Sequence, residues 1–201
     1  ACLIDKRAFL DVNLDLLVAH ELAHQWFGDL VTCRDWSHAW LNEGFATYFE
    51  ILFQEHDKGR DEAQYELFQN AVAYFDEDSR RYRRPIVCAT YKYPWTIFDR
   101  HTYEKGAWVL HMLRAELGDQ AWWKVISHYL KKHRDSSVET IDLIQAIAEV
   151  TGRNLKPFFD QWVFRAGYPV LRAQYAWDAV HQKGDVWIAK VQDVSDESPA
   201  F

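Results

Sequence analysis

The 201-residue chain is poor in the residues and runs that mark several classes of protein. Cysteine occurs only at Cys2, Cys33 and Cys88, an odd number at wide spacing, which argues against a disulfide framework and predicts free thiols. No stretch approaches the ~20 consecutive apolar residues of a membrane-spanning helix. We therefore expect a soluble protein without a membrane span, with a lean towards the cytoplasm, although the sequence leaves the compartment and the oligomeric state open.

Positive charge is also scarce, because 23 Lys and Arg residues stand against 30 Asp and Glu residues, for a formal net charge of −7. A nucleic-acid or anionic-membrane surface as the main function is therefore excluded, since either needs a dominant basic face. The single methionine is Met112 and the chain opens with Ala1, so we expect a piece of a longer protein. Hydrophobic residues make up 49% of the chain, enough for a full-sized core.

Apolar residues recur at helical spacing over most of the chain, and glycine or capping residues stand where these patterns stop. Gly28, Gly59 and Gly118 supply such stops, and Asp119 caps the helix that follows Gly118. The predicted helices cover residues 10–26, 41–58, 61–75, 103–117, 119–129, either 136 or 140 to 151, and 154–164.

After Gly167 the period changes from helical to alternating, which predicts a strand over residues 171–177. A turn at Lys183-Gly184-Asp185 leads to a partner strand over 186–194. The fold class is therefore mainly α. We predict a helical domain over residues 1–167 and the truncated beginning of a β-rich domain over 168–201.

The sequence His20-Glu21-Leu22-Ala23-His24 lies within the first predicted helix. Two histidines four residues apart project from one helical face, one turn apart, and can hold a single metal ion. A catalytic zinc ion takes three protein ligands and keeps one position open for water, so a third ligand must come from another segment. Glu43, in Trp40-Leu41-Asn42-Glu43-Gly44, is the candidate. A metzincin is excluded, since Phe27 and Leu30 stand where that class has glycine and histidine.

These residues carry a family resemblance. The His-Glu-Leu-Ala-His motif, the spacing of eighteen residues and Glu43 resemble the zinc signature of the M1 aminopeptidases, which are gluzincins of the aminopeptidase N type. Tyr103-Glu104-Lys105-Gly106-Ala107 resembles the catalytic-tyrosine motif of that family. Trp162 and Gly167-Tyr168-Pro169 resemble the end of its catalytic domain. The resemblance implies the helical half of a thermolysin-like zincin catalytic domain.

The resemblance also implies roles for five residues and one zinc ion per chain. His20, His24 and Glu43 would bind the zinc ion, and Glu21 would be the general base that takes a proton from a metal-activated water and passes it to the leaving amine. Tyr103 would stabilise the tetrahedral intermediate. The implied activity is zinc-dependent removal of N-terminal residues from peptides, with peptide substrates and the remaining domains of the protein as partners.

One expected segment of the family is absent. M1 enzymes carry a Gly-Ala-Met-Glu-Asn-like segment upstream of the zinc helix, whose glutamate binds the substrate α-amine, and this chain has none. We therefore expect the isolated chain to bind zinc but to turn over peptides poorly. The preferred N-terminal residue stays open. So do two alternatives, a catalytically inactive interaction module and an M1 relative with epoxide hydrolase activity.

Other polar residues have weaker claims to function. Glu50 follows Glu43 by seven residues, on the same helical face, and is a candidate to accept a hydrogen bond from a ligand histidine. Asp29 and Asp35 are weaker candidates for that role, with capping or solvent exposure as the alternative. We interpret the remaining histidines as structural. The basic run Arg80–Arg84 and the acidic run Asp76–Asp78 are predicted to be solvated faces, with a rim that attracts charged substrates as the alternative.

Overall fold

The computed structural model describes residues 14–192 of the chain, and the predicted mainly α fold is confirmed. Residues 10–13 of the first predicted helix and 193–194 of the last strand lie outside the described residues. Within the described part, no helix is both long enough and apolar enough to cross a membrane. The helices are α1 (Leu14–Ala23), α2 (Trp40–Asp57), α3 (Arg60–Arg80), α4 (Glu104–Leu117), α5 (Asp119–Lys132), α6 (Thr140–Thr151) and α7 (Lys156–Trp162).

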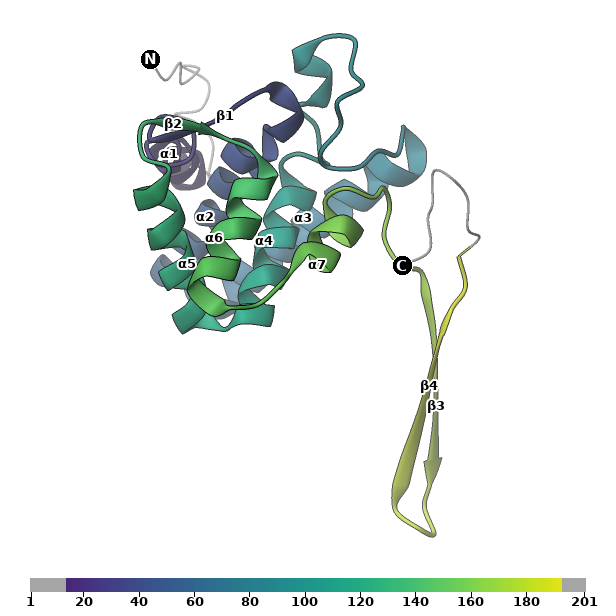
Figure 1. Cartoon of the computed structure of the whole chain (residues 1–201). Helices are drawn as coiled ribbons and strands as arrows, with labels where there is room; N and C mark the ends of the chain where they lie inside the picture. Colours follow the sequence, from purple (N-terminus) through teal and green to yellow (C-terminus); the bar gives the residue numbers. More distant parts are fainter. Residues whose placement is uncertain (1–13, 193–201) are drawn as a thin grey trace.

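Helix α2 is the central element of the bundle, with α1, α3 and α4 packed around it and α5 against α6 (Figure 1). Its position follows from its sequence, because apolar side chains cover most of its circumference and are buried, among them Trp40, Phe45 and Ile51. Two short 3₁₀ helices, η2 (Trp36–His38) and η3 (Pro94–Ile97), lie in the connections.

Two short strands were not predicted. β1 (Val31–Cys33) and β2 (Ser136–Val138) pair in parallel, with Val31 opposite Ser136 and Cys33 opposite Val138. This pairing ties the segment between α1 and α2 to the segment between α5 and α6. Helix α6 therefore starts at Thr140, the second of the two predicted starts, where Glu139 and Asp142 form a reciprocal capping box.

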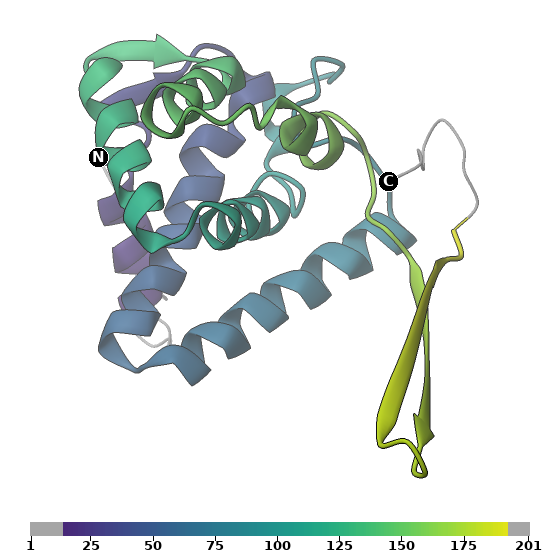
Figure 2. The ribbon, with the colours of Figure 1, turned by 60° about the horizontal axis from the view of Figure 1, so that its bottom comes forward.

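Helix α3 is longer than predicted. It continues past Phe75 to Arg80, and Figure 2 shows it as a long rod along one side of the bundle. Its last two turns carry Glu77 and Asp78, which are only 9% and 5% exposed. The prediction that this acidic run is a solvated face is therefore wrong for these two side chains.

The C-terminal hairpin consists of β3 (Leu171–Asp178) and β4 (Lys183–Lys190), which pair antiparallel and extend away from the helices (Figure 1). The predicted turn at Lys183-Gly184-Asp185 is wrong, because the chain already turns at residues 179–182. The Asp178 carboxylate accepts hydrogen bonds from the backbone N–H groups of Val180 and His181, which closes the turn earlier. A separate β domain that starts at residue 168 remains a prediction.

Two glycines allow α2 and α4 to approach closely. A Cβ atom added to Gly106 would lie 3.1 Å from the Gly44 Cα atom, and one added to Gly44 would lie 3.1 Å from Gly106 Cα and 3.2 Å from the Thr102 carbonyl oxygen. All three atoms belong to the backbone and cannot rotate away. The contact therefore fixes the distance between the helix that carries Glu43 and the helix that follows Tyr103.

Replacing Gly106 by alanine is expected to destabilise the protein. Alanine favours a helix by about 1 kcal/mol over glycine, but overpacking costs about 1–3 kcal/mol. The cost should lie near the upper end of that range here, because the atom nearest to the added methyl group belongs to the backbone. We expect a net loss of about 1–2 kcal/mol in the free energy of unfolding, visible as a lower Tm in calorimetry. Gly44→Ala should produce a similar loss, and an unchanged Tm in both variants would contradict this account of the contact.

Candidate metal centre

The side chains of His20, His24 and Glu43 converge on one point. Glu43 Oε2 lies 3.3 Å from His20 Nε2 and 3.2 Å from His24 Nε2, and the three atoms all lie within 4.8 Å of one another. Ligand atoms at 2.0–2.2 Å from a tetrahedral zinc ion are separated by roughly 3.3–3.6 Å. The donor set and its spacing therefore fit zinc.

The local backbone explains how His24 reaches this position. Helix α1 ends at Ala23, three residues before the predicted end, but the His24 N–H still bonds to the His20 carbonyl oxygen at 3.3 Å, so the two rings stay one turn apart. The chain then reverses at Gly28, where φ is +151° and an added Cβ would lie 3.1 Å from the His24 carbonyl oxygen. Glycine is required there because other residues rarely adopt this conformation.

The outer nitrogen of each imidazole has its own partner. His24 Nδ1 donates to the Phe27 carbonyl oxygen at 3.0 Å, and His20 Nδ1 contacts Glu50 Oε1. The predicted contact of Glu50 with a candidate ligand histidine is therefore confirmed. In the neutral form that binds a metal, each ring would keep its proton on Nδ1 and present the lone pair of Nε2 to the point of convergence.

Neither of the weaker candidates joins this arrangement. The Asp35 carboxylate accepts from the Ser37 N–H at 2.8 Å and caps η2, and Asp29 is solvent-exposed. Asp35 is therefore a capping residue and Asp29 an exposed one, which were the alternatives to a role beside the ligand histidines.

Electrostatics favour a cation at the point of convergence. Burial acts to lower the pKa of His20, but hydrogen bonds to Glu43 and Glu50 outweigh burial and raise it to about 9. Burial acts to raise the pKa of Glu43, but its contacts with His20 and His24 outweigh burial and lower it to about 2. The two carboxylates thus hold a positive charge on the His20 imidazole at neutral pH, and contact with Glu43 also raises the pKa of His24. A divalent cation would take over this role with release of protons.

Tyr103 and Glu21 lie beside the three candidate ligands. The Tyr103 ring stacks on the His20 ring, with 6.1 Å between centroids and 15° between planes. Burial raises the pKa of Tyr103 far above its ordinary value, and the charges of Glu43, Glu104 and Glu21 add to the effect. The hydroxyl therefore keeps its proton and remains a hydrogen-bond donor at any physiological pH.

His20, Glu21 and Tyr103 line a cleft of about 890 Å³. His20, Glu21, Glu50 and Tyr103 form one part of its wall, and the other part comes from the end of α3 and the segment before α4. That second part was not predicted as part of the site. It contains both signs of charge, in Glu77, Arg81, Asp99 and Arg100, and Glu66 of α3 and Glu104 of α4 also line the cleft. Of the two charged runs, Glu77 and Arg81 line the cleft, and a rim that attracts charged substrates remains a prediction.

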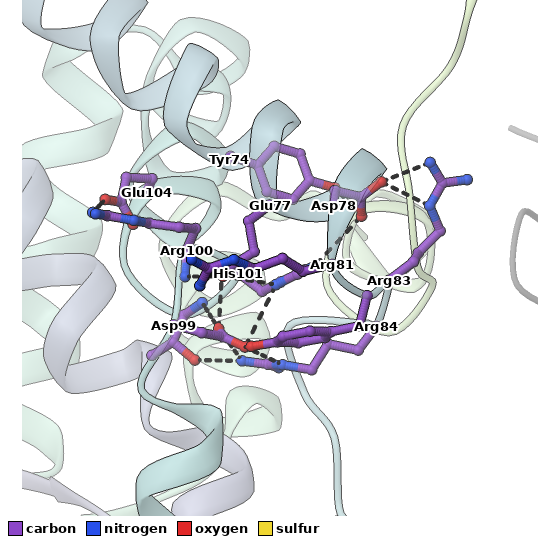
Figure 3. A network of polar contacts seen from close by, with 12 residues as sticks. Tyr74, Glu77, Asp78, Arg81, Arg83, Arg84, Asp99, Arg100, His101 and Glu104 are labelled. Atoms are coloured by element: carbon purple, nitrogen blue, oxygen red, sulfur yellow. Dashed lines mark hydrogen bonds and ion pairs between the residues drawn. The ribbon is translucent and has the colours of Figure 1, made fainter.

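The second wall belongs to a polar network, part of which is buried (Figure 3). Arg84 is only 9% exposed and pairs with Asp99, so the prediction that the whole basic run is solvated is wrong for Arg84. His101 Nε2 contacts Asp78 Oδ1 at 3.3 Å, in agreement with a structural histidine. Glu77, Asp99 and His101 lie close enough to hold a metal ion. We assign none, because Arg81 and Arg84 already neutralise the two carboxylates.

Replacing Glu50 by glutamine should weaken zinc binding by about 10–100-fold, since partners that orient ligand histidines contribute this much to metal affinity. Glutamine keeps the size of the side chain but loses the charge that faces His20. Competition with a chromogenic chelator measures the affinity. Glu62→Gln, the same change at an exposed position, is the control. Equal zinc affinity in the two variants would show that Glu50 does not support the metal centre.

The helical fold and the convergent donor set are typical of zinc metallopeptidases. Comparison with known families supports this class, because the model of the family described as "Peptidase family M1 domain" matches residues 6–162. The chain belongs to peptidase family M1, a family of zinc metallopeptidases and aminopeptidases.

Curated relatives agree with this assignment. Aminopeptidase M1-C of Oryza sativa subsp. japonica is 37% identical over 161 residues, which are 79% of this chain and 18% of that protein. Glutamyl aminopeptidase of Sus scrofa is 36% identical over 162 residues, 79% of this chain and 17% of that protein. The chain thus spans about a fifth of the length of the curated relatives it matches.

Solved structures match the fold. The M1 zinc metallopeptidase of Deinococcus radiodurans, in a mutant form bound to the substrate Tyr-Ser-Ala, superposes with a TM-score of 0.62 at 34% identity and covers 74% of this chain and 32% of that one. Legionella pneumophila aminopeptidase A, in complex with aspartic acid, gives a TM-score of 0.73 at 24% identity and covers 88% of this chain and 19% of that one.

Proposed function

We propose that the protein containing this chain is a zinc-dependent aminopeptidase that hydrolyses N-terminal residues from peptides. The convergence of His20, His24 and Glu43 carries the proposal, since Glu43 Oε2 lies 3.3 and 3.2 Å from the two Nε2 atoms, which is close to the ligand spacing around zinc. These three residues would hold one zinc ion per chain. When bound, zinc supplies Lewis-acid activation of water and of the scissile carbonyl group.

The other two residues would handle the proton and the developing charge. Glu21 lies on the wall of the cleft, where its carboxylate would take the proton of the attacking water and then deliver it to the leaving amine. The Tyr103 hydroxyl, protonated because of its burial, would donate a hydrogen bond to the oxyanion. Two further facts support a peptide substrate: the relatives are named aminopeptidases, and the Deinococcus enzyme binds a tripeptide.

Removal and return of the metal test this proposal in the intact protein. By intact protein we mean this chain together with the other domains of the protein to which it belongs. The purified protein should contain one zinc ion per chain by elemental analysis and should release amino acids from peptides and aminoacyl anilides. Dialysis against a chelator should abolish the activity, and one equivalent of zinc should restore it. N-acetylated peptides should not be cleaved, because an aminopeptidase requires a free α-amine.

Other outcomes would separate the alternatives. Zinc binding without turnover of peptides or anilides would favour the catalytically inactive interaction module. Hydrolysis of an epoxide substrate would show that the protein also has epoxide hydrolase activity. The isolated 201-residue chain should bind zinc but show little turnover. A zinc-loaded intact protein that cleaves no peptide would refute the proposal.

A further inference from the structure

A buried ion pair anchors the segment that leads to Tyr103. Arg84 follows the end of α3, and its Nε atom donates to Asp99 Oδ2 at 2.8 Å, with a second contact from Nη2 to Asp99 Oδ1 (Figure 3). The side chains are 10% and 7% exposed. A bidentate pair shielded from water in this way is stronger and more directional than a surface pair.

The rest of the Arg84 guanidinium group binds the same connection. Its Nη1 atom donates to the carbonyl oxygens of Pro85 and Ile86 at 2.7 and 2.8 Å, and its Nη2 atom donates to the Ile97 carbonyl oxygen at 3.0 Å and to Thr102 Oγ1 at 2.8 Å. These acceptors all lie between α3 and α4. One side chain therefore fixes the beginning and the end of this connection relative to each other.

Asp99 passes this constraint to the backbone of Tyr103. Its Oδ1 atom accepts from the N–H groups of His101 and Thr102 at 3.0 and 3.1 Å, and its carbonyl oxygen accepts from the Tyr103 N–H at 3.1 Å. Tyr82 also donates its hydroxyl to Asp99 Oδ2 at 2.6 Å. The turn that starts α4, and with it the direction of the Tyr103 side chain, depends on the orientation of Asp99.

We propose that Arg84 and Asp99 are positioning residues for the reaction, which hold the Tyr103 hydroxyl in place beside His20 and Glu43. The inference rests on the proposed function. Neither residue contacts a candidate zinc ligand, and the pair acts on the backbone that carries Tyr103. Loss of the pair would therefore impair the step in which Tyr103 takes part, and would leave zinc binding intact.

A double-mutant cycle in the zinc-loaded intact protein tests this. Arg84→Gln is expected to lower kcat by about 10–100-fold, since a misplacement near 1 Å has this effect, with KM changed by less than about twofold and the zinc content unchanged. In a Tyr103→Phe background the same substitution should have almost no further effect on kcat, because the group it positions is gone.

Equal losses of kcat in both backgrounds would show that Arg84 acts independently of Tyr103 and would overturn the inference, as would loss of zinc. Thr102→Val provides a second, milder variant if Arg84→Gln does not fold, since it removes the hydroxyl that Arg84 binds but keeps the ion pair. Its smaller loss of kcat should also vanish in the Tyr103→Phe background, and persistence of that loss would overturn the inference.

Arg153→Gln is the matched control. Arg153 is an exposed arginine that pairs with Glu116 outside the cleft, and its replacement should leave kcat, KM and zinc content unchanged. The cycle also separates the two proposals. An inactive zinc-loaded wild-type protein would refute the aminopeptidase function, whereas an active protein with additive losses would refute only the positioning role.

Discussion

Glu21→Gln in the zinc-loaded intact protein is expected to lower kcat for peptides and aminoacyl anilides by about 10²–10⁴-fold, the range that a positioned general base contributes. The zinc content should not change, because the proposed metal donors are His20, His24 and Glu43, and Glu21 is not among them. Glutamine retains the shape of the side chain but cannot take up a proton. Steady-state kinetics and elemental analysis on the same sample measure both quantities.

Glu62→Gln serves as the control for this prediction too, because it makes the identical chemical change on an exposed part of α3 outside the cleft. It should retain wild-type turnover. Wild-type turnover in Glu21→Gln would rule out the general-base role. Loss of zinc together with activity would show that Glu21 supports the metal centre, and the assignment of the base would then have to move to another residue.

The sequence predicted the helices well because their stability comes from a local pattern. Apolar spacing located α2, α4, α5, α6 and α7 to within a few residues, and Gly118 ended α4 as expected. Apolar spacing gave no signal for β1 and β2. These strands have three residues each and are held by pairing between Val31–Cys33 and Ser136–Val138. A contact between segments a hundred residues apart leaves no periodic signal in either segment.

The residues of the candidate site could likewise be predicted only where a local pattern places them. The spacing of His20 and His24 and the seven-residue interval from Glu43 to Glu50 are properties of helices, so the sequence could place these side chains on common faces. The network around Arg84 could not be predicted, since a local run of charge looks solvated wherever its partners are distant. Its partner Asp99 gave one weak signal, because an aspartate carboxylate commonly accepts from backbone N–H groups two or three residues on, as Asp99 does from His101 and Thr102.

The convergence of α1, α2 and α4 depends on contacts that no single motif reveals. His20 and Glu43 come from different helices, and Tyr103 comes from the start of a third. The contact between Gly44 and Gly106 limits how closely the last two helices approach, while Arg84 binds the segment that leads to Tyr103.

Tyr103→Phe is expected to lower kcat by about 10²–10³-fold, the cost of removing one hydrogen-bond donor from a developing oxyanion. The ring that stacks on His20 remains, so the zinc content should stay at the wild-type value.

KM should also change little, because a donor that acts only on the transition state lowers kcat and kcat/KM together. Tyr65→Phe, at an exposed tyrosine on α3, is the matched control and should behave as wild type. A tyrosine that only filled space in the core would leave kcat unaffected when its hydroxyl is removed. A rise in KM alone would instead place the hydroxyl in ground-state substrate binding, and either result would exclude the oxyanion role.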